Sequence, residues 1–359
     1  MPSRADEARR VIEGNAGPRG FYAGRDCRQY RVRDLVFSME ALLRLGHQER
    51  VESHMALLLD RMKPDGRVPA RVETAGGLRK GVRPRLWLTA LRQRGPYILR
   101  NLGQYSDPFQ SWTMDSAPLA LTGLRRLQRA KSRLPRGRAA EITRLKAWVD
   151  SRRDPETDLL RGAGWMDAMD VYSGRFTLCG LAVMHRMRVA WGEGKAAERL
   201  RRVLDVGFWD PALGFYRDHD RGRAFDTLAH ALLLQDGAVP EERAPKVLSA
   251  LEWAATRFGY LNLTPPYPAH ACGQWPRVYQ NSTVWPFVQG QAILALAKAG
   301  EEGAARREMR KLEALEGFGE WHDPGTGRPM GSAEQLWSAA SFLQALEAVT
   351  GEPIEGPAK

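Results

Sequence analysis

Apolar residues recur every three or four positions along most of the chain, which is the spacing that gives an α-helix one buried face. One clear run starts near Gln29 and carries Val32, Leu35, Val36 and Met39 on a single face. The same pattern predicts further helices over residues 3–12, 51–62, 112–130, 138–149, 172–191, 195–206, 224–234, 241–258, 283–299, 302–315 and 334–349. No stretch alternates apolar and polar residues clearly enough to predict a β-strand. The chain is therefore expected to be all-α, with about twelve helices.

Helices in consecutive pairs fit either an (α/α)6 toroid, in which an inner ring lies inside an outer ring, or an α-solenoid. A solenoid would show a sequence repeat of fixed period, and none is visible. The connections after alternate helices are long and rich in aromatic residues, at 64–111, 154–171, 208–222, 259–282 and 317–333. These long connections should gather at one rim, where loops carry function. We therefore predict one domain over residues 1–359, an (α/α)6 toroid of about six helical hairpins.

The first of these connections, 64–111, is the longest and has poor helical periodicity. A connection of this length inside a compact protein is usually functional or disordered. Its aromatic residues, Trp87, Tyr97, Tyr105 and Phe109, favour an ordered rim loop or lid.

The net charge is +12, which would suit a nucleic-acid partner if the basic residues were concentrated. They are instead spread along the chain and mixed with acidic residues, as over 301–308. The densest basic segment, 125–138, lacks the interleaved aromatic residues on which bases stack. Solvated helix faces therefore explain the charge better than a nucleic-acid interface.

The three cysteines, Cys27, Cys179 and Cys272, are too few and too widely spaced for a disulfide framework, which fits a reducing compartment. The N-terminus is charged and lacks the apolar core of a secretory signal, and no apolar run is long enough to span a membrane. We therefore expect a cytoplasmic protein with no membrane partner.

Two carboxylates beside tryptophans are the main candidates for chemistry. Trp165 and Asp167 follow a predicted helix end, and Glu320 and Trp321 lie on the last long connection. An apolar neighbour disfavours the charged form of a carboxyl group, which is one way to make a general acid. Two such carboxylates on separate loops suggest an acid and a base on either side of a glycosidic bond.

The rim segments share tryptophan, tyrosine, carboxylate and arginine, which suits a pocket for neutral sugar rings. The residues that carry this composition include Tyr30, Arg33, Asp34, Trp112, Asp115, Trp165, Trp285 and Trp321. The alternative is structural: tryptophans at helix starts pack in the core, and aspartates cap helices. Recurrence at the same rim favours the sugar pocket.

Several segments resemble a known group of enzymes, the glucosidase domain of glycogen debranching enzymes and the neutral/alkaline invertases. They are QYRVRDLVFS at 29–38, WMDA at 165–168, NSTVWP at 281–286, EWHDP at 320–324 and QLWS at 335–338, and they occur in the family's order. The resemblance implies an (α/α)6 barrel that hydrolyses a glycosidic bond with inversion. It also implies Asp167 as general acid, Glu320 as general base, Arg33 and Asp34 as partners of the sugar hydroxyls, and Trp112, Asp115, Trp285 and Trp337 as the pocket lining.

The chain departs from the invertases just after Asp167, where it has YSGRF at 172–176 in place of a His-Pro segment. The subsite for the leaving group is therefore expected to differ from theirs, and Asp170 remains an alternative to Asp167 as the acid. The resulting expectation is an inverting exo-glycosidase that hydrolyses a small α-linked glucoside.

The alternatives are a sugar epimerase or a phosphorylase on the same scaffold, and a basic helical binding protein without enzymatic activity. Metalloprotease, nucleophile-elbow and P-loop motifs do not occur in the sequence. The seven histidines are scattered, so neither a metal site nor a cofactor is expected. The partner that we expect is a small oligosaccharide or glucoside.

Overall fold

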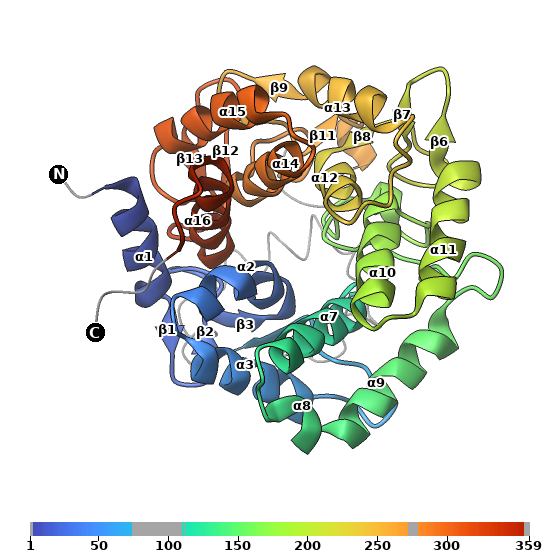
Figure 1. Ribbon diagram of the computed structural model, residues 1–359, viewed down its shortest axis with the longest axis vertical. Coiled ribbons are helices and arrows are strands. Elements are labelled where there is room, and N and C mark those ends of the chain that lie inside the picture. Colours follow the sequence, from blue (N-terminus) through green and yellow to red (C-terminus); the bar gives the residue numbers. More distant parts are fainter. Residues whose placement is uncertain (1–2, 74–109, 112, 272–278, 355–359) are drawn as a thin grey trace.

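Six helices form a closed inner ring in the computed structural model, which describes residues 3–73, 110–111, 113–271 and 279–354 (Figure 1). They are α2 (Val32–Arg44), α7 (Ser116–Arg129), α10 (Leu178–Ala190), α12 (Thr227–Gln235), α14 (Pro286–Lys298) and α16 (Leu336–Thr350). Each packs against the next one along the chain, and α16 packs against α2, which closes the ring.

Within the described ranges, an outer helix packs on each helix of the inner ring. The outer helices are α1 (Arg4–Gly14), α3 (Gln48–Asp60), α9 (Ala139–Arg152), α11 (Gly194–Val203), α13 (Ala244–Trp253) and α15 (Glu302–Ala314), and a short α8 (Leu134–Gly137) precedes α9. The first of them, α1, packs on the last inner helix, α16. The predicted (α/α)6 toroid is therefore confirmed.

The sequence separates the two rings by how much of each helix is apolar. Helix α14 is buried on almost every side, from Pro286 to Leu296. Helix α11 buries only Ala197 and Leu200 and turns its charged residues outward. A helix that is apolar all round belongs in the interior, whereas a narrow apolar stripe suits an outer position.

The all-α class is confirmed, and the strands that the sequence pattern did not predict have only two or three residues each in the described part. The strands are β1 (Ala16–Gly17), β2 (Gly20–Phe21), β3 (Gln29–Arg31), β4 (Arg71–Glu73), β5 (Gln110–Ser111), β6 (Trp209–Asp210), β7 (Phe215–Tyr216), β8 (Phe225–Asp226), β9 (Ala255–Thr256), β10 (Gly259–Tyr260), β11 (Leu263–Thr264), β12 (Trp321–His322) and β13 (Pro329–Met330). All their pairings are antiparallel, and β3, β4 and β5 form the one sheet of three strands in the described part. Strands this short cannot show the alternation that predicts a strand.

Several predicted helix starts were too early. The helix expected from residue 172 begins at Leu178, where Thr177 caps it by accepting a hydrogen bond from the Gly180 N–H at 3.0 Å. The helix expected from residue 283 begins at Pro286, whose fixed φ suits a first helical position. Near Gln29, the residues before Val32 form β3. Most of the predicted lid, together with Trp112 and Cys272, lies outside the described residues.

All six inner helices run in the same direction. Their C-terminal halves line one common cavity, so their first turns and the long connections lie at the other end of the ring. The candidate catalytic residues therefore belong to the end that carries the helix N-termini.

Candidate active site

Charged side chains gather where the inner helices begin. Arg33 and Asp34 lie in the first turn of α2, Asp115 is the N-cap of α7, and Asp226 is the N-cap of α12. Asp226 caps its helix by accepting from the Ala229 N–H at 3.0 Å. Asp115 makes no capping hydrogen bond. Its carboxylate accepts hydrogen bonds from Arg33 instead.

Arg33 joins three parts of the chain. Its guanidinium donates to both carboxylate oxygens of Asp115, at 2.8 and 3.1 Å, and to the carbonyl of Gly164 at 2.5 Å. Its third nitrogen, Nη1, reaches Oδ2 of Asp167 at 3.2 Å. Burial alone would lower the pKa of Arg33, but the charges of Asp115 and Asp167 raise it above its ordinary value. This cation therefore fixes the position of the Asp167 carboxylate.

The backbone on both sides of Asp167 is held by Gln280. The side-chain amide of Gln280 donates to the carbonyl of Trp165 at 2.5 Å and accepts from the Ala168 N–H at 2.8 Å. Asn262 in turn donates to the carbonyl of Gln280 at 2.7 Å. The Asp167 side chain itself is 36% exposed, so it is both anchored and open to a ligand.

Glu320 is held from two sides. Oε1 accepts from the hydroxyl of Tyr279 at 2.5 Å, and Oε2 accepts from the Ser332 N–H at 3.1 Å. Gly331, with φ of +74°, lies directly over this carboxylate, and a Cβ there would clash with Oε2. Glycine is therefore required at this position for Glu320 to keep its place.

Tyr279 links the two candidate catalytic carboxylates electrostatically. Burial raises the pKa of Tyr279 well above its ordinary value, and the charge of Glu320 and, more weakly, that of Asp167 add to the rise. Both carboxylates therefore act on one hydroxyl group.

Asp34 is a buried acid whose carboxylate makes no hydrogen bond to the part of the chain that the structure describes. It is 2% exposed, and neither of its oxygens has a hydrogen-bond partner. Burial, with a smaller contribution from the charge of Glu320, raises its pKa to about 7 although Arg31 opposes this rise. A group of this kind can pair with a hydroxyl that enters the site, which fits the expected role of Asp34.

The tryptophans lie in the core. Trp165, Trp285 and Trp337 are at most 5% exposed. The ring of Trp285 packs edge to face against both others, with centroids 5.5 Å from that of Trp165 and 6.0 Å from that of Trp337. Trp321 is also buried. These tryptophans therefore pack in the core, as the alternative to a sugar pocket expected. Stacking of a sugar on their rings stays a prediction. Trp112 lies outside the described residues.

Tyr30 packs against other aromatic side chains. Its ring contacts Tyr22 and His54, and its hydroxyl accepts from the Arg19 N–H at 3.3 Å. These contacts give no support to a role in substrate binding.

Sequence reasoning missed Gln280 and Asn262 as parts of the site. Both are buried polar residues on the connection 259–282, and Gln280 directly precedes the NSTVWP segment, which was the available signal. Asp170, the alternative acid, begins the short 3-10 helix η1 (Asp170–Tyr172). No group of three metal-ligating side chains occurs within the described residues. In the same residues, no helix is both long and apolar enough to cross a membrane.

Comparison with known proteins supports a sugar-cleaving class. Residues 190–338 match the family model described as "Mannosylglycerate hydrolase MGH1-like glycoside hydrolase domain". A curated relative, glucosylglycerate hydrolase of Mycolicibacterium hassiacum, is 30% identical over 160 residues. That match covers 41% of this chain and 35% of the relative, so the chain aligns with about a third of the relative's length.

Solved structures extend the likeness to nearly the whole fold. The GH63 mannosylglycerate hydrolase from Thermus thermophilus in complex with glucose matches with a TM-score of 0.70 at 18% identity, over 95% of this chain and 99% of that one. The same enzyme with Tris and D-glycerate matches with a TM-score of 0.68 at 16% identity, over 95% and 99% of the chains. A rhamnosidase from Klebsiella oxytoca with rhamnose bound matches with a TM-score of 0.66 at 14% identity, over 97% of this chain and 63% of that one.

The fold of the chain is that of the (α/α)6-barrel enzymes named above. The glycoside hydrolase likeness in sequence is carried by the segment 190–338, which is similar to the MGH1-like domain. The more specific likeness to debranching enzymes and neutral invertases stays a prediction.

Proposed function

We propose that the chain is an inverting exo-glycosidase that hydrolyses a small α-linked glycoside, with glycerate as the leaving group. The observation that carries the mechanism is the pair of anchored carboxylates, Asp167 beside Arg33 and Glu320 beside Tyr279, which both influence the Tyr279 hydroxyl. The choice of glycerate comes from the named relatives, which are hydrolases of glucosylglycerate and mannosylglycerate.

In this mechanism Asp167 donates its proton to the glycosidic oxygen as the bond from that oxygen to the anomeric carbon breaks. Glu320 takes a proton from a water molecule whose oxygen attacks the anomeric carbon from the opposite face. Inversion requires room for that water, with the two carboxyl groups roughly 6.5–9.5 Å apart. General acid and base catalysis each typically contribute about 10²–10⁴-fold to the rate.

Arg33 and Asp34 are the proposed partners of the sugar hydroxyls. Arg33 is already engaged by two carboxylates, so its main effect is to fix Asp115 and Asp167. Asp34 has two buried acceptor atoms without partners in the described chain, which would make it the stronger contact for a sugar hydroxyl.

The test is a panel of glycosides followed by NMR. Glucosylglycerate, mannosylglycerate, sucrose, trehalose and isomaltose are incubated with the protein, and the anomer that appears first is identified. Release of the β-anomer from an α-linked glycerate glycoside supports the proposal. First release of the α-anomer would contradict inversion, and turnover of a disaccharide without turnover of either glycerate glycoside would contradict the leaving group.

The same panel separates the alternative reactions. A phosphorylase would release sugar phosphate only when inorganic phosphate is added, and an epimerase would invert a sugar carbon without cleaving the glycosidic bond. An epimerase needs an accessible proton-transfer group. Of the three histidines near the rim, His219 and His322 are both buried, whereas His270 is exposed. Burial lowers the pKa of each of the two buried histidines.

A further inference from the structure

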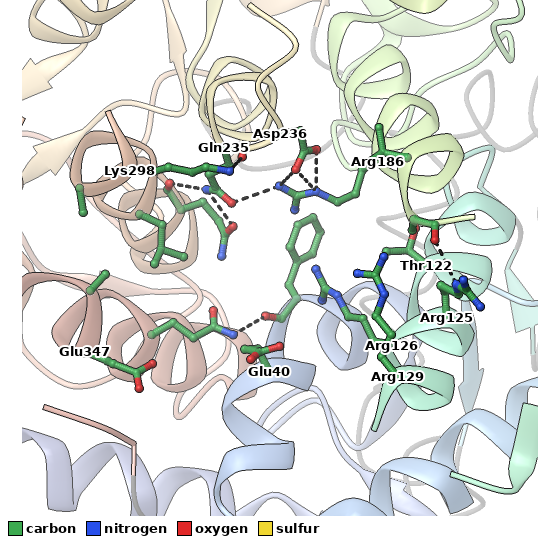
Figure 2. Close-up of a pocket in the computed structure, with 18 of the residues that line it drawn as sticks. Glu40, Thr122, Arg125, Arg126, Arg129, Arg186, Gln235, Asp236, Lys298 and Glu347 are labelled. Atoms are coloured by element: carbon green, nitrogen blue, oxygen red, sulfur yellow. Dashed lines mark hydrogen bonds and ion pairs between the residues drawn. The ribbon is translucent and has the colours of Figure 1, made fainter. Parts of the chain in front are cut away.

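A cavity of about 650 Å³ lies at the end of the ring that carries the C-termini of the inner helices (Figure 2). All six inner helices contribute to its wall. In α2, Arg33 and Asp34 occupy the first turn, whereas Glu40 and Arg44 in the last turns line the cavity. At 1.5 Å per residue, Arg33 and Arg44 are about 16 Å apart along the helix axis. The cavity is therefore separate from the candidate active site.

Every carboxylate in the cavity wall is already paired with an arginine. Arg44 pairs with Glu40 at 3.1 Å and also with Glu347. Arg186 pairs with Asp236 through two of its nitrogens, the closest contact being 2.8 Å. Arg44 and Arg186 therefore pair with all the acidic groups of the wall, and the other basic residues of the wall are not needed for this.

Four cations of the wall have no carboxylate partner among the residues that the structure describes: Arg125, Arg126, Arg129 and Lys298. Two of them have a structural role. Arg125 and Lys298 donate to the carbonyls of the last residues of α10 and α12. Cations at these positions satisfy free carbonyl groups and complement the negative end of the helix dipole.

Arg126 and Arg129 lie in the last turn of α7 and complement its dipole, but in the described part of the chain neither binds a carbonyl at the end of a helix. Arg126 donates to the carbonyl of Val36, which lies inside α2 and not at its end. Arg129 is exposed and has no hydrogen bond or ion pair from its side chain within the described residues. Both extend from α7 into the cavity, across from Arg186 (Figure 2).

The electrostatics at Arg126 are unfavourable for a cation. Burial and, more weakly, repulsion by Arg186 lower its pKa to about 10, although the charges of Glu40 and Asp236 oppose this effect. Among the described residues, only Arg186 of these three arginines is paired with a carboxylate, that of Asp236. An anion between them would relieve the repulsion and complete their hydrogen bonds.

We propose that this cavity binds a small molecule through an oxyanion group, a phosphate or a carboxylate, that accepts hydrogen bonds from Arg126, Arg129 and Arg186. The planar guanidinium fork matches both groups. The rest of the wall suits a polar organic molecule, because Gln235, Gln291 and Gln344 can pair with hydroxyls and Phe37 offers an apolar face. This inference does not depend on the proposed glycosidase activity.

The test is isothermal titration of the full chain with inorganic phosphate and, separately, with citrate, in sodium chloride of matched ionic strength. The variants are Arg126→Gln and Arg129→Gln. Arg136→Gln is the control, because Arg136 is exposed on α8 and its loss removes the same charge outside the cavity. We expect saturable binding by the wild type and the control, weakened at least about tenfold in both cavity variants.

The relative affinity for phosphate and citrate identifies which oxyanion the cavity prefers. Absence of saturable binding for both probes would overturn the proposal. Equal affinity in all four proteins would also overturn it, because binding would then lie elsewhere, for example near Arg33. Arg129→Gln keeps the test valid even if Arg126→Gln fails to fold, since Arg129 is exposed.

Discussion

Arg33 holds the carboxylate of Asp115 through two parallel hydrogen bonds of 2.8 and 3.1 Å. The Asp115 side chain is only 2% exposed, so its charge has little access to water. Because Arg33 lies at the start of α2 and Asp115 at the start of α7, the pair joins two neighbouring inner helices at the candidate active site. It also leaves one nitrogen of Arg33 to reach Asp167.

We expect Arg33→Met to lower the free energy of unfolding by about 3–5 kcal/mol, because it leaves the Asp115 charge buried without its partner. The double variant Arg33→Met/Asp115→Asn removes that charge and should recover part of the loss. Urea unfolding of both proteins and the wild type measures the difference. An Arg33→Met protein as stable as the wild type would show that the pair does not stabilise the fold.

Asp167→Asn should lower kcat on the best glycoside of the panel by about 10²–10⁴-fold while leaving the melting temperature unchanged. Asp170→Asn is the matched variant, because it changes the neighbouring acid in the same way. We expect it to keep most of the activity. If instead Asp170→Asn loses activity and Asp167→Asn keeps it, the general acid is Asp170.

Gln280→Met should lower kcat about tenfold or more and change KM little. Methionine has a similar length but cannot bridge Trp165 and Ala168, so the acid loses its fixed orientation. The pH–rate profile should also shift, which a general loss of stability would not cause. Gln128→Met, an exposed substitution on α7, serves as the control. An unchanged kcat in Gln280→Met would rule out the positioning role.

Arg175 is the cation that we expect to recognise a glycerate leaving group. It follows Asp167 in the chain, and its side chain has no carboxylate partner among the described residues, although its charge lowers the pKa of the neighbouring His219. Arg175→Gln should raise KM for glucosylglycerate about tenfold or more and leave KM for a neutral glucoside unchanged. Arg310→Gln on the outer helix α15 is the control. Equal effects on both substrates would contradict this assignment.

Asp34 should make the stability of the fold depend on pH. Its pKa is about 7 in the folded protein against an ordinary 3.8, so between these values the folded state binds more protons than the unfolded state. The free energy of unfolding therefore falls as pH rises through this window, and the loss is complete above pH 7. Asp34→Asn should remove this slope, which amounts to on the order of 4 kcal/mol. Urea unfolding from pH 4 to pH 8 tests it, and parallel curves for the two proteins would contradict it.

The helices of the toroid could be predicted because each buries a continuous face, as the run from Val32 to Met39 shows. Helix boundaries were less accurate, because local capping decides them. Thr177 caps α10, which begins at Leu178, well after the apolar pattern starts at Tyr172. Short strands such as β3 depend on pairing with a segment that is distant in sequence, and no local pattern records this.

For the candidate site, the sequence indicated which residues lie at the rim but not how they meet. Arg33, Asp115 and Asp167 were all named, and the structure joins them by hydrogen bonds. The contact of Gln280 with Trp165 spans 115 positions and involves a backbone carbonyl, so side-chain identity gave no sign of it. The tryptophans were expected as pocket walls because an aromatic residue has the same appearance in a sequence whether it lines a pocket or packs in a core.

Helix α2 carries Arg33 and Asp34 in its first turn and the cavity residues Glu40 and Arg44 in its last turns. A shift of this helix along its axis would move both sets by the same distance. A ligand bound among Arg126, Arg129 and Arg186 would lie against the C-terminal end of α2. The candidate active site and the cavity therefore share the inner helices as rigid parts. A redesign of the inner helices at one end of the ring would alter the other end. Changes to the outer helices would have less effect on either.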